Sequence, residues 1–312
     1  MKQGNKNGGW TKSLALVLSK NNQAKVNGQH ASAATRDKRS DVLFSGFRKL
    51  RELGYKLEDV RGFGGRHMDA LVKSWVSSGY SASTMQNNIS IFRVFTNWIG
   101  KDGLVRPSKT YVQDVRQVTR SLATETDKSW SGQRVDFKQK RNEVSKICPR
   151  CAIQLELQRA FGLRAKESWL LRPHGADKGS YLSVSHGTKG GRDRVIANTN
   201  SYQREVLQRA KALSDKNGST SDPAKSLSQW KNHYYHVMRK AGITRTNGVT
   251  SHGLRHERLQ EVYKEHTGTS APVRTEGRRD HVPAEDDKAA RQEVAEVAGH
   301  SRDSIAAAYI GK

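Results

Sequence analysis

The chain has 312 residues, 34% of them hydrophobic, which is enough for packed cores and excludes disorder throughout. Lysine and arginine number 55 against 30 acidic residues, and the formal charge of +25 predicts a polyanionic partner and an affinity that falls steeply with salt. The longest apolar stretch near the N-terminus, Leu14 to Leu18, is too short for a signal peptide or a membrane span, so we expect a cytoplasmic protein with no membrane partner.

The N-terminal segment, residues 1–36, is basic and contains no acidic side chain. Its lysines and its arginine stand among Asn, Gly and Gln, a composition that predicts a flexible basic arm. Such an arm can follow a DNA groove, but basic termini are also common without a specific role. Both interpretations are open from the sequence.

Residues 37–115 are predicted to form a small helical domain. Apolar residues recur at helical spacing from Asp41 to Leu53, from Arg66 to Ser77, and again after Ser83 or Thr84, either of which can cap a helix. The aromatic residues on these stripes are most simply core, because they lack the strand-borne pattern of a base-stacking RNA module. Residues 116–130 are expected to be a linker.

The rest of the chain, residues 131–312, is predicted to be mostly helical with a small antiparallel sheet. Helical patterns cover residues 133–147, 150–161, 201–214 and 226–241. Polar alternation at 181–185 and the apolar pair after Arg194 flank a Gly-rich turn, which suggests a β-hairpin. The predicted fold class is therefore mainly α with a small antiparallel β-sheet.

The two cysteines form a single Cys-Pro-Arg-Cys motif, Cys148 to Cys151. Without a second cysteine pair or a suitably spaced histidine, the motif does not complete a tetrahedral zinc site, so we expect no metal there. The favoured interpretation is two small thiols near the start of a buried helix, kept reduced by the cytosol.

Five short pieces of the C-terminal half carry phosphate-binding and proton-transfer groups. They are Arg164, which precedes Glu167; Lys189 at the tip of the hairpin; His252 with Arg255; His300 after Gly299; and Tyr309. Singly, each has an ordinary structural interpretation, such as a helix-surface ion pair or a turn histidine. The sequence His256-Glu257 begins a zinc-protease motif, but Gln260 stands where the second histidine would be, so that class is rejected.

The order Arg, Lys, His-x-x-Arg, Gly-His and Tyr resembles the catalytic set of the tyrosine recombinases, the phage integrase family. The similarity runs from about residue 38 to the end of the chain. It implies a core-binding domain over residues 37–115 that contacts DNA, and an α+β catalytic domain over residues 131–312. The expected partners are double-stranded DNA, further copies of the chain in a homotetramer on two DNA sites, and an accessory DNA-bending or directionality factor, with localisation at the bacterial nucleoid when bound.

The chemistry of the two arginines and the tyrosine fits that resemblance. The planar guanidiniums of Arg164 and Arg255 can hold the non-bridging oxygens of a phosphodiester bidentately. Tyr309 is the candidate nucleophile, and because a phenol is mostly protonated at neutral pH it needs a base, for which His252 is the candidate. The product would be a 3′-phosphotyrosyl bond that retains the bond energy, so no cofactor is expected.

Two further roles come from the family. His300 is expected to donate a hydrogen bond to a non-bridging oxygen, and Lys189 to protonate the departing 5′ hydroxyl. The chain departs from the family in the long separation of Arg255 and His300, whose extra length falls in residues 267–290, predicted to be an inserted surface loop.

The predicted function is site-specific recombination that integrates or excises a mobile element such as a phage, an island or a conjugative element. Two alternatives are open. One is a DNA-relaxing enzyme like the type IB topoisomerases, which use the same chemistry without strand exchange. The other is a non-catalytic DNA-binding accessory protein.

Overall fold

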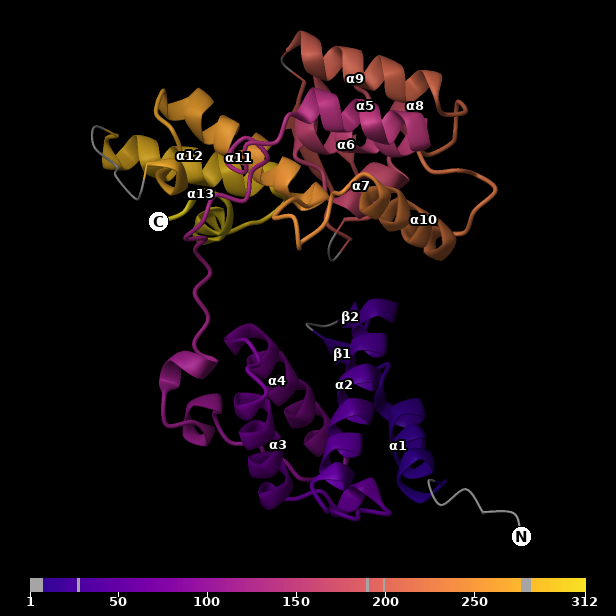
Figure 1. The fold of residues 1–312 in the computed structure, drawn as a ribbon, viewed down its shortest axis with the longest axis vertical. Helices are drawn as coiled ribbons and strands as arrows, with labels where there is room; N and C mark the ends of the chain where they lie inside the picture. The colour runs from indigo at the N-terminus through magenta and orange to yellow at the C-terminus, as the bar shows by residue number, and fades with distance from the viewer. Residues whose placement is uncertain (1–7, 27–28, 189–190, 199, 276–281) are drawn as a thin grey trace. The chain divides into compact units, whose positions relative to one another are not determined.

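Helices dominate the structure, a computed structural model in which residues 8–26, 29–188, 191–198, 200–275 and 282–312 are described. The chain divides into two units, residues 1–120 and 121–312, each with its own hydrophobic core (Figure 1). The predicted fold class, mainly α with a small antiparallel sheet, is confirmed. In the described part of the chain, no helix is long and apolar enough to cross a membrane.

The first unit packs its helices around an aromatic core. Its described elements are α1 (Gly8–Asn21), β1 (Lys25–Val26), β2 (Gln29–His30), α2 (Ala33–Glu52), η1 (Val60–Gly62), α3 (Gly65–Ser77), α4 (Ala82–Trp98), η2 (Ser108–Tyr111) and η3 (Val115–Val118). The hydroxyls of Ser32 and Ser81 cap α2 and α4 by accepting backbone N–H bonds. Helices α2 and α4 approach closely at Gly46, where a Cβ atom would lie 2.5 Å from the ring of Phe92.

The prediction of a flexible basic arm over residues 1–36 is wrong for its described part, because residues 8–21 form helix α1. Trp10 packs against Phe44 and Phe47 of α2, with ring centroids 6.1 and 6.3 Å apart. Leu14 is fully buried in the same core. The prediction rested on charge and overlooked an apolar stripe at helical spacing. The lysines of this helix are exposed, while the apolar stripe packs into the core.

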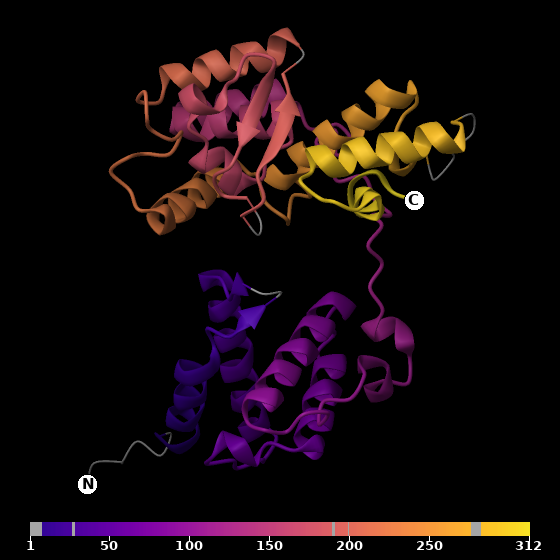
Figure 2. The same ribbon diagram turned by 180° about the vertical axis from the view of Figure 1, so that it is seen from behind.

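The second unit holds the predicted site. Its described elements are α5 (Phe137–Ile147), α6 (Pro149–Phe161), α7 (Ala165–Leu170), α8 (Pro173–Ala176), β3 (Tyr181–Val184), β4 (Arg194–Ala197), α9 (Ser201–Ala212), α10 (Leu227–Lys240), α11 (Ser251–Thr267), η5 (Pro272–Arg274), α12 (Ala284–Val297), η6 (Asp303–Ala306) and α13 (Ala307–Ile310). The predicted hairpin is confirmed: β3 and β4 pair antiparallel, with Tyr181 opposite Ala197 (Figure 2).

Helix α6 is the centre of this unit, with α5, α7, α9 and α11 packed around it. Nearly all of its side chains are buried, including polar ones that find partners inside. Gln158, for example, is completely buried, and its side-chain amide donates to the Tyr234 hydroxyl of α10 at 2.9 Å. The helix ends at Gly162, whose φ of +61° turns the chain sharply into α7. That turn delivers Arg164 to the start of α7.

The predicted linker over residues 116–130 is shorter in the structure, since residues from 121 onward belong to the second unit. The Trp130 indole N–H donates to the carbonyl of Thr250 at 2.8 Å and fixes the start of α11. Gly253 allows this packing, because a Cβ there would lie 2.6 Å from the carbonyl oxygen of Lys128. The glycine of the His-Gly-Leu-Arg motif is therefore required by sterics.

The prediction that residues 267–290 form a loop is wrong for residues 284–290, which begin helix α12. Three acidic residues in its first turn favour a helix N-terminus, and Ala290 is buried against α11. The phenol of Tyr263 on α11 donates to Asp287 at 2.7 Å, which ties the two helices together. Residues 276–281 lie outside the described part of the chain.

Candidate active site

The structure brings five of the six predicted site residues together within the second unit. Arg255 Nε donates to the Tyr309 hydroxyl at 3.3 Å, and Arg164 Nη2 lies 3.3 Å from His300 Nε2. The rings of His252 and Tyr309 have centroids 6.2 Å apart. The sixth, Lys189, lies outside the described residues.

Both guanidiniums are oriented by the carbonyl of Ala298, just past the end of α12. Arg164 Nη2 donates to this oxygen at 2.9 Å, and Arg255 Nη2 donates to the same oxygen. Arg255 Nη1 also donates to the carbonyl of Gly162. Since the C-terminal end of a helix carries a partial negative charge, α12 favours two cations here.

Arg255 is completely buried, which distinguishes it from a surface arginine. Burial lowers the pKa of its guanidinium to about 10, although the Tyr309 side chain acts in the opposite direction. The group is still protonated at neutral pH. The site thus holds a fixed positive charge that its own carbonyl partners keep in one orientation.

A buried carboxylate, Glu167, supports the first arginine. It accepts from Arg164 Nη1 at 2.7 Å and, on the other side, two bonds of 2.7 and 2.8 Å from Arg194 of β4. Burial would raise the pKa of Glu167, but the hydrogen bonds and charge of Arg194, followed by Arg164, lower it to about 2. The two arginines and the carboxylate therefore form a fully ionised, oriented set.

Arg194 is a site residue that the sequence analysis did not single out. The inward-outward alternation of β4 is the signal that could have found it, because residues 194 and 196 point inward. The backbone of Gly299, with φ +69°, lies directly over it: a Cβ at that position would meet Arg194 Cδ at 3.1 Å. This close approach explains why the residue before His300 is a glycine, because a side chain at position 299 would press against Arg194.

Removing the charge of Glu167 is expected to destabilise the protein in a pH-dependent way. Because the folded-state pKa of about 2 lies below the ordinary value of 4.5, the carboxylate adds on the order of 3 kcal/mol above pH 5, and this is lost as the pH falls toward 2. We expect Glu167→Gln to lower the free energy of unfolding at pH 7 by an amount of this order.

Urea unfolding of both proteins at several pH values measures this effect. The difference in the free energy of unfolding between Glu167→Gln and the unaltered chain should shrink as the pH falls toward 2. Glu205→Gln, at a carboxylate that is 64% exposed, serves as the control and should change little. A gap that stayed constant over this pH range would contradict the assignment.

Two histidines lie on one face of α11 beside the tyrosine. The ring centroids of His252 and His256 are 5.3 Å apart, and His256 lies 5.1 Å from the ring of Tyr309. Burial, reinforced by neighbouring positive charges, lowers the pKa of His252 to about 3 and that of His256 to about 4. Both rings are therefore neutral at pH 7, and each keeps a lone pair that can accept a proton.

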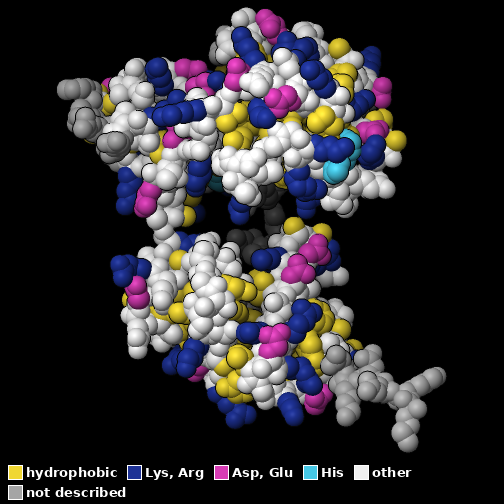
Figure 3. All heavy atoms as spheres, viewed as in Figure 1, with side chains coloured by type: hydrophobic (Ala, Val, Ile, Leu, Met, Phe, Trp, Pro, Cys, Tyr) yellow, Lys and Arg dark blue, Asp and Glu magenta, His cyan; other side chains and the backbone are white. Residues whose placement is uncertain are grey.

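A groove of about 1050 Å³ opens beside these histidines. Its lining includes Lys128, Arg239 and Arg245 together with His252 and His256, and none of the described residues that line it is acidic. Lys and Arg side chains also spread over the surface of the second unit (Figure 3). The site thus adjoins a basic concavity that suits a phosphate backbone.

Two family models match the chain, one described as "Phage integrase, N-terminal" over residues 17–105 and one described as "Integrase" over residues 123–261. No curated protein sequence matches it. A lambda integrase dimer bound to a COC′ core site has a similar fold, with 13% identity, a TM-score of 0.59, and 96% of this chain and 94% of that chain covered.

Two more solved structures share the fold. A lambda integrase tetramer bound to a Holliday junction is 13% identical, with a TM-score of 0.56 and coverage of 93% of this chain and 78% of that chain. The Tn1549 transposon integrase in complex with circular intermediate DNA is 12% identical, with a TM-score of 0.58 and coverage of 96% and 95%.

Each of the two structural units contains one family match: the "Phage integrase, N-terminal" match lies in the first unit and the "Integrase" match in the second. Since the two matches together cover most of the chain, it belongs to the phage integrase family. This confirms the resemblance found in the sequence. The "Integrase" match ends at residue 261, so it does not extend to His300 or Tyr309.

Proposed function

We propose that this chain is a site-specific recombinase that cuts and rejoins DNA through a 3′-phosphotyrosyl bond to Tyr309, and that it integrates or excises a mobile genetic element. The observation that carries the proposal is the buried guanidinium of Arg255, which donates to the Tyr309 hydroxyl at 3.3 Å. A phosphate held by that guanidinium would lie beside the oxygen that attacks it.

In this proposal, Arg164 and Arg255 bind the non-bridging oxygens of the scissile phosphate. Because the Ala298 carbonyl already orients both, little side-chain freedom is lost when charge develops on those oxygens. His300 adds a further donor. If its Nε2 accepts from Arg164, the neutral ring carries its proton on Nδ1, which is then the donating atom.

His252 accepts the phenol proton in its neutral form, and the negative charge of the bound phosphate would raise the pKa that burial lowers in the free protein. The Tyr309 oxygen bonds to phosphorus as the bond to the 5′ oxygen breaks, and Lys189 protonates that leaving oxygen. The role of Lys189 rests on its sequence position between β3 and β4. Rejoining reverses these steps with the 5′ hydroxyl of another strand, and the retained bond energy makes ATP unnecessary.

The expected partners are double-stranded DNA and further copies of this chain in a homotetramer on two DNA sites. Support comes from similar folds solved as a dimer on a core site and as a tetramer on a Holliday junction. We also propose an accessory DNA-bending or directionality factor, and a place at the bacterial nucleoid when the protein is bound.

The groove beside the histidines predicts where part of the DNA backbone runs. If Arg239 contacts a phosphate, Arg239→Ala should weaken binding several-fold on any sequence and reduce the slope of log affinity against log salt by about 1. Fluorescence anisotropy at several salt concentrations measures both. Lys231→Ala, an exposed lysine of the same helix that does not line the groove, is the matched control. Equal slopes for the two variants would place the DNA elsewhere.

Covalent trapping tests the proposed chemistry. A nicked suicide duplex would carry the short direct repeats that border the inserted segment beside the gene. The expected product is a protein–DNA adduct stable to detergent, joined at a 3′ phosphate, with a free 5′ hydroxyl on the released fragment. Absence of any adduct would favour the DNA-binding accessory protein, and relaxation of supercoils without strand exchange would favour the topoisomerase-like enzyme.

A further inference from the structure

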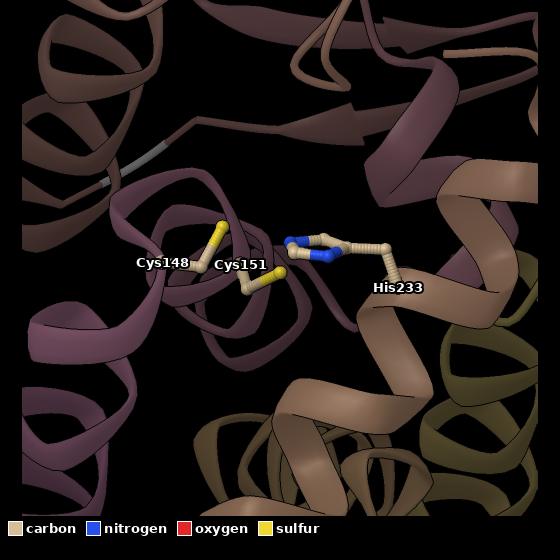
Figure 4. Close-up of side chains that lie close together, drawn as sticks. All are labelled: Cys148, Cys151 and His233. Atoms are coloured by element: carbon tan, nitrogen blue, oxygen red, sulfur yellow. The ribbon is translucent and has the colours of Figure 1, made fainter.

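Two cysteines and a histidine converge where α5 passes into α6. The sulfurs of Cys148 and Cys151 and a ring nitrogen of His233 all lie within 4.8 Å of one another. Figure 4 shows the imidazole of His233, on α10, turned toward both sulfurs. The sequence has no histidine at a suitable spacing from the two cysteines, but the fold brings His233 to them from a distant part of the chain.

Local structure explains how the two sulfurs meet. Cys148 is the N-cap of α6 in an extended conformation, Pro149 begins the helix, and one turn later Cys151 lies on the same side. The positive end of the helix dipole at this point favours thiolates, the form in which cysteine binds metals. Cys151 is fully buried and Cys148 partly so.

The histidine is held in place by its own helix. Trp230 and Tyr234 of α10 are buried in the same core as Cys151, which turns this face of α10 toward α6. The ring of His233 packs on that of Trp230 with centroids 5.2 Å apart. The imidazole thus reaches the sulfurs from a packed position rather than from a freely rotating one.

We propose that Cys148, Cys151 and His233 bind a zinc ion, with water as the fourth ligand. Zinc–sulfur bonds of about 2.3 Å place two sulfurs of one tetrahedral zinc about 3.8 Å apart. Side-chain rotations that move the two sulfurs and the imidazole nitrogen by about 1 Å therefore bring all three within bonding distance of one zinc ion. Two thiolates and an imidazole select zinc over magnesium or calcium, which prefer oxygen ligands. Each thiol releases its proton when the metal binds.

Bound zinc would join the start of α6 to α10, one wall of the basic groove. Tyr235, Met238 and Arg239 of α10 line that groove beside His252. The protein already links the two helices through Gln158 and Tyr234. The metal would therefore hold this wall in place, whichever reaction the neighbouring site performs.

Metal content and cobalt spectra of the full-length protein test the proposal. Protein purified under reducing conditions should contain one zinc ion per chain, as measured by elemental mass spectrometry. Cobalt(II) added to the metal-free protein should give thiolate-to-cobalt charge-transfer bands in the near ultraviolet and the visible bands of tetrahedral cobalt. His233→Gln should weaken zinc affinity by more than about 100-fold.

His236→Gln is the matched control, since it changes an exposed histidine on the same helix and should bind zinc normally. The Cys148→Ser variant should lose most of the charge-transfer absorption, and circular dichroism of each variant reports whether it folds. Zinc at background together with absent cobalt bands in the unaltered protein would overturn the proposal. So would unchanged zinc affinity in a folded His233→Gln variant.

Discussion

Tyr309→Phe is expected to abolish covalent trapping on a suicide duplex while leaving salt-sensitive DNA binding nearly intact. The substitution removes only the hydroxyl, so the attacking atom is lost and the ring that packs between His256 and Arg255 stays. The basic groove is untouched. The rate of adduct formation should fall by several orders of magnitude.

A change in stability must be separated from this loss of chemistry. Without the hydroxyl, the buried Nε of Arg255 loses its acceptor, which costs about 1–3 kcal/mol. Melting curves of the variant therefore accompany the trapping assay. Tyr235→Phe is the matched control, because Tyr235 lines the groove and its ring contacts those of Trp169 and Tyr234. If Tyr309→Phe still formed an adduct, another residue would be the nucleophile.

The order of the site residues could be predicted from the sequence because each lies in a short local motif. Arg164 follows a helix-ending glycine, and His252 and Arg255 share one helical turn. Spacing of this kind is visible without knowledge of the fold. The structure then adds that the motifs are within hydrogen-bonding distance of one another.

What orients these residues could not be predicted, because it depends on long-range contacts. The carbonyl of Ala298 binds both guanidiniums, yet a main-chain oxygen leaves no trace in the sequence. Arg194 reaches Glu167 only after β4 pairs with β3. His233 joins the two cysteines through the packing of α10 on α6, which no spacing rule anticipates.

The errors in the fold have a common physical cause. Helix α12 carries many charges, and α1 carries two lysines in a segment that has no acidic residue. A count of charge or of Gly and Pro describes the exposed face of such a helix, not its buried one. Burial of Trp10 and Ala290 decides the outcome in each case. An amphipathic pattern therefore outweighs composition in predicting whether such a segment folds.

Arg255→Lys is expected to slow cleavage by about 10²- to 10³-fold with little change in DNA affinity. An ammonium keeps the positive charge, but it cannot reach the carbonyls of Gly162 and Ala298 and the Tyr309 hydroxyl with the fixed geometry of a guanidinium. Phosphate and phenol would no longer share one oriented donor. Single-turnover cleavage of the suicide duplex and equilibrium binding on the same duplex measure the two quantities separately.

Arg255→Ala is the less informative change, because it removes the side-chain donor to the Gly162 carbonyl, takes one of two donors from the Ala298 carbonyl and leaves a cavity at a completely buried position. Its loss of activity would combine misfolding with missing chemistry. Arg204→Lys controls for the lysine substitution, since it makes the same exchange at an exposed position of α9 that does not line the groove and should leave cleavage unchanged. If Arg255→Lys cleaved within about threefold of the unaltered protein, charge alone would suffice at this position, and the shared guanidinium could not be what aligns the phosphate with Tyr309.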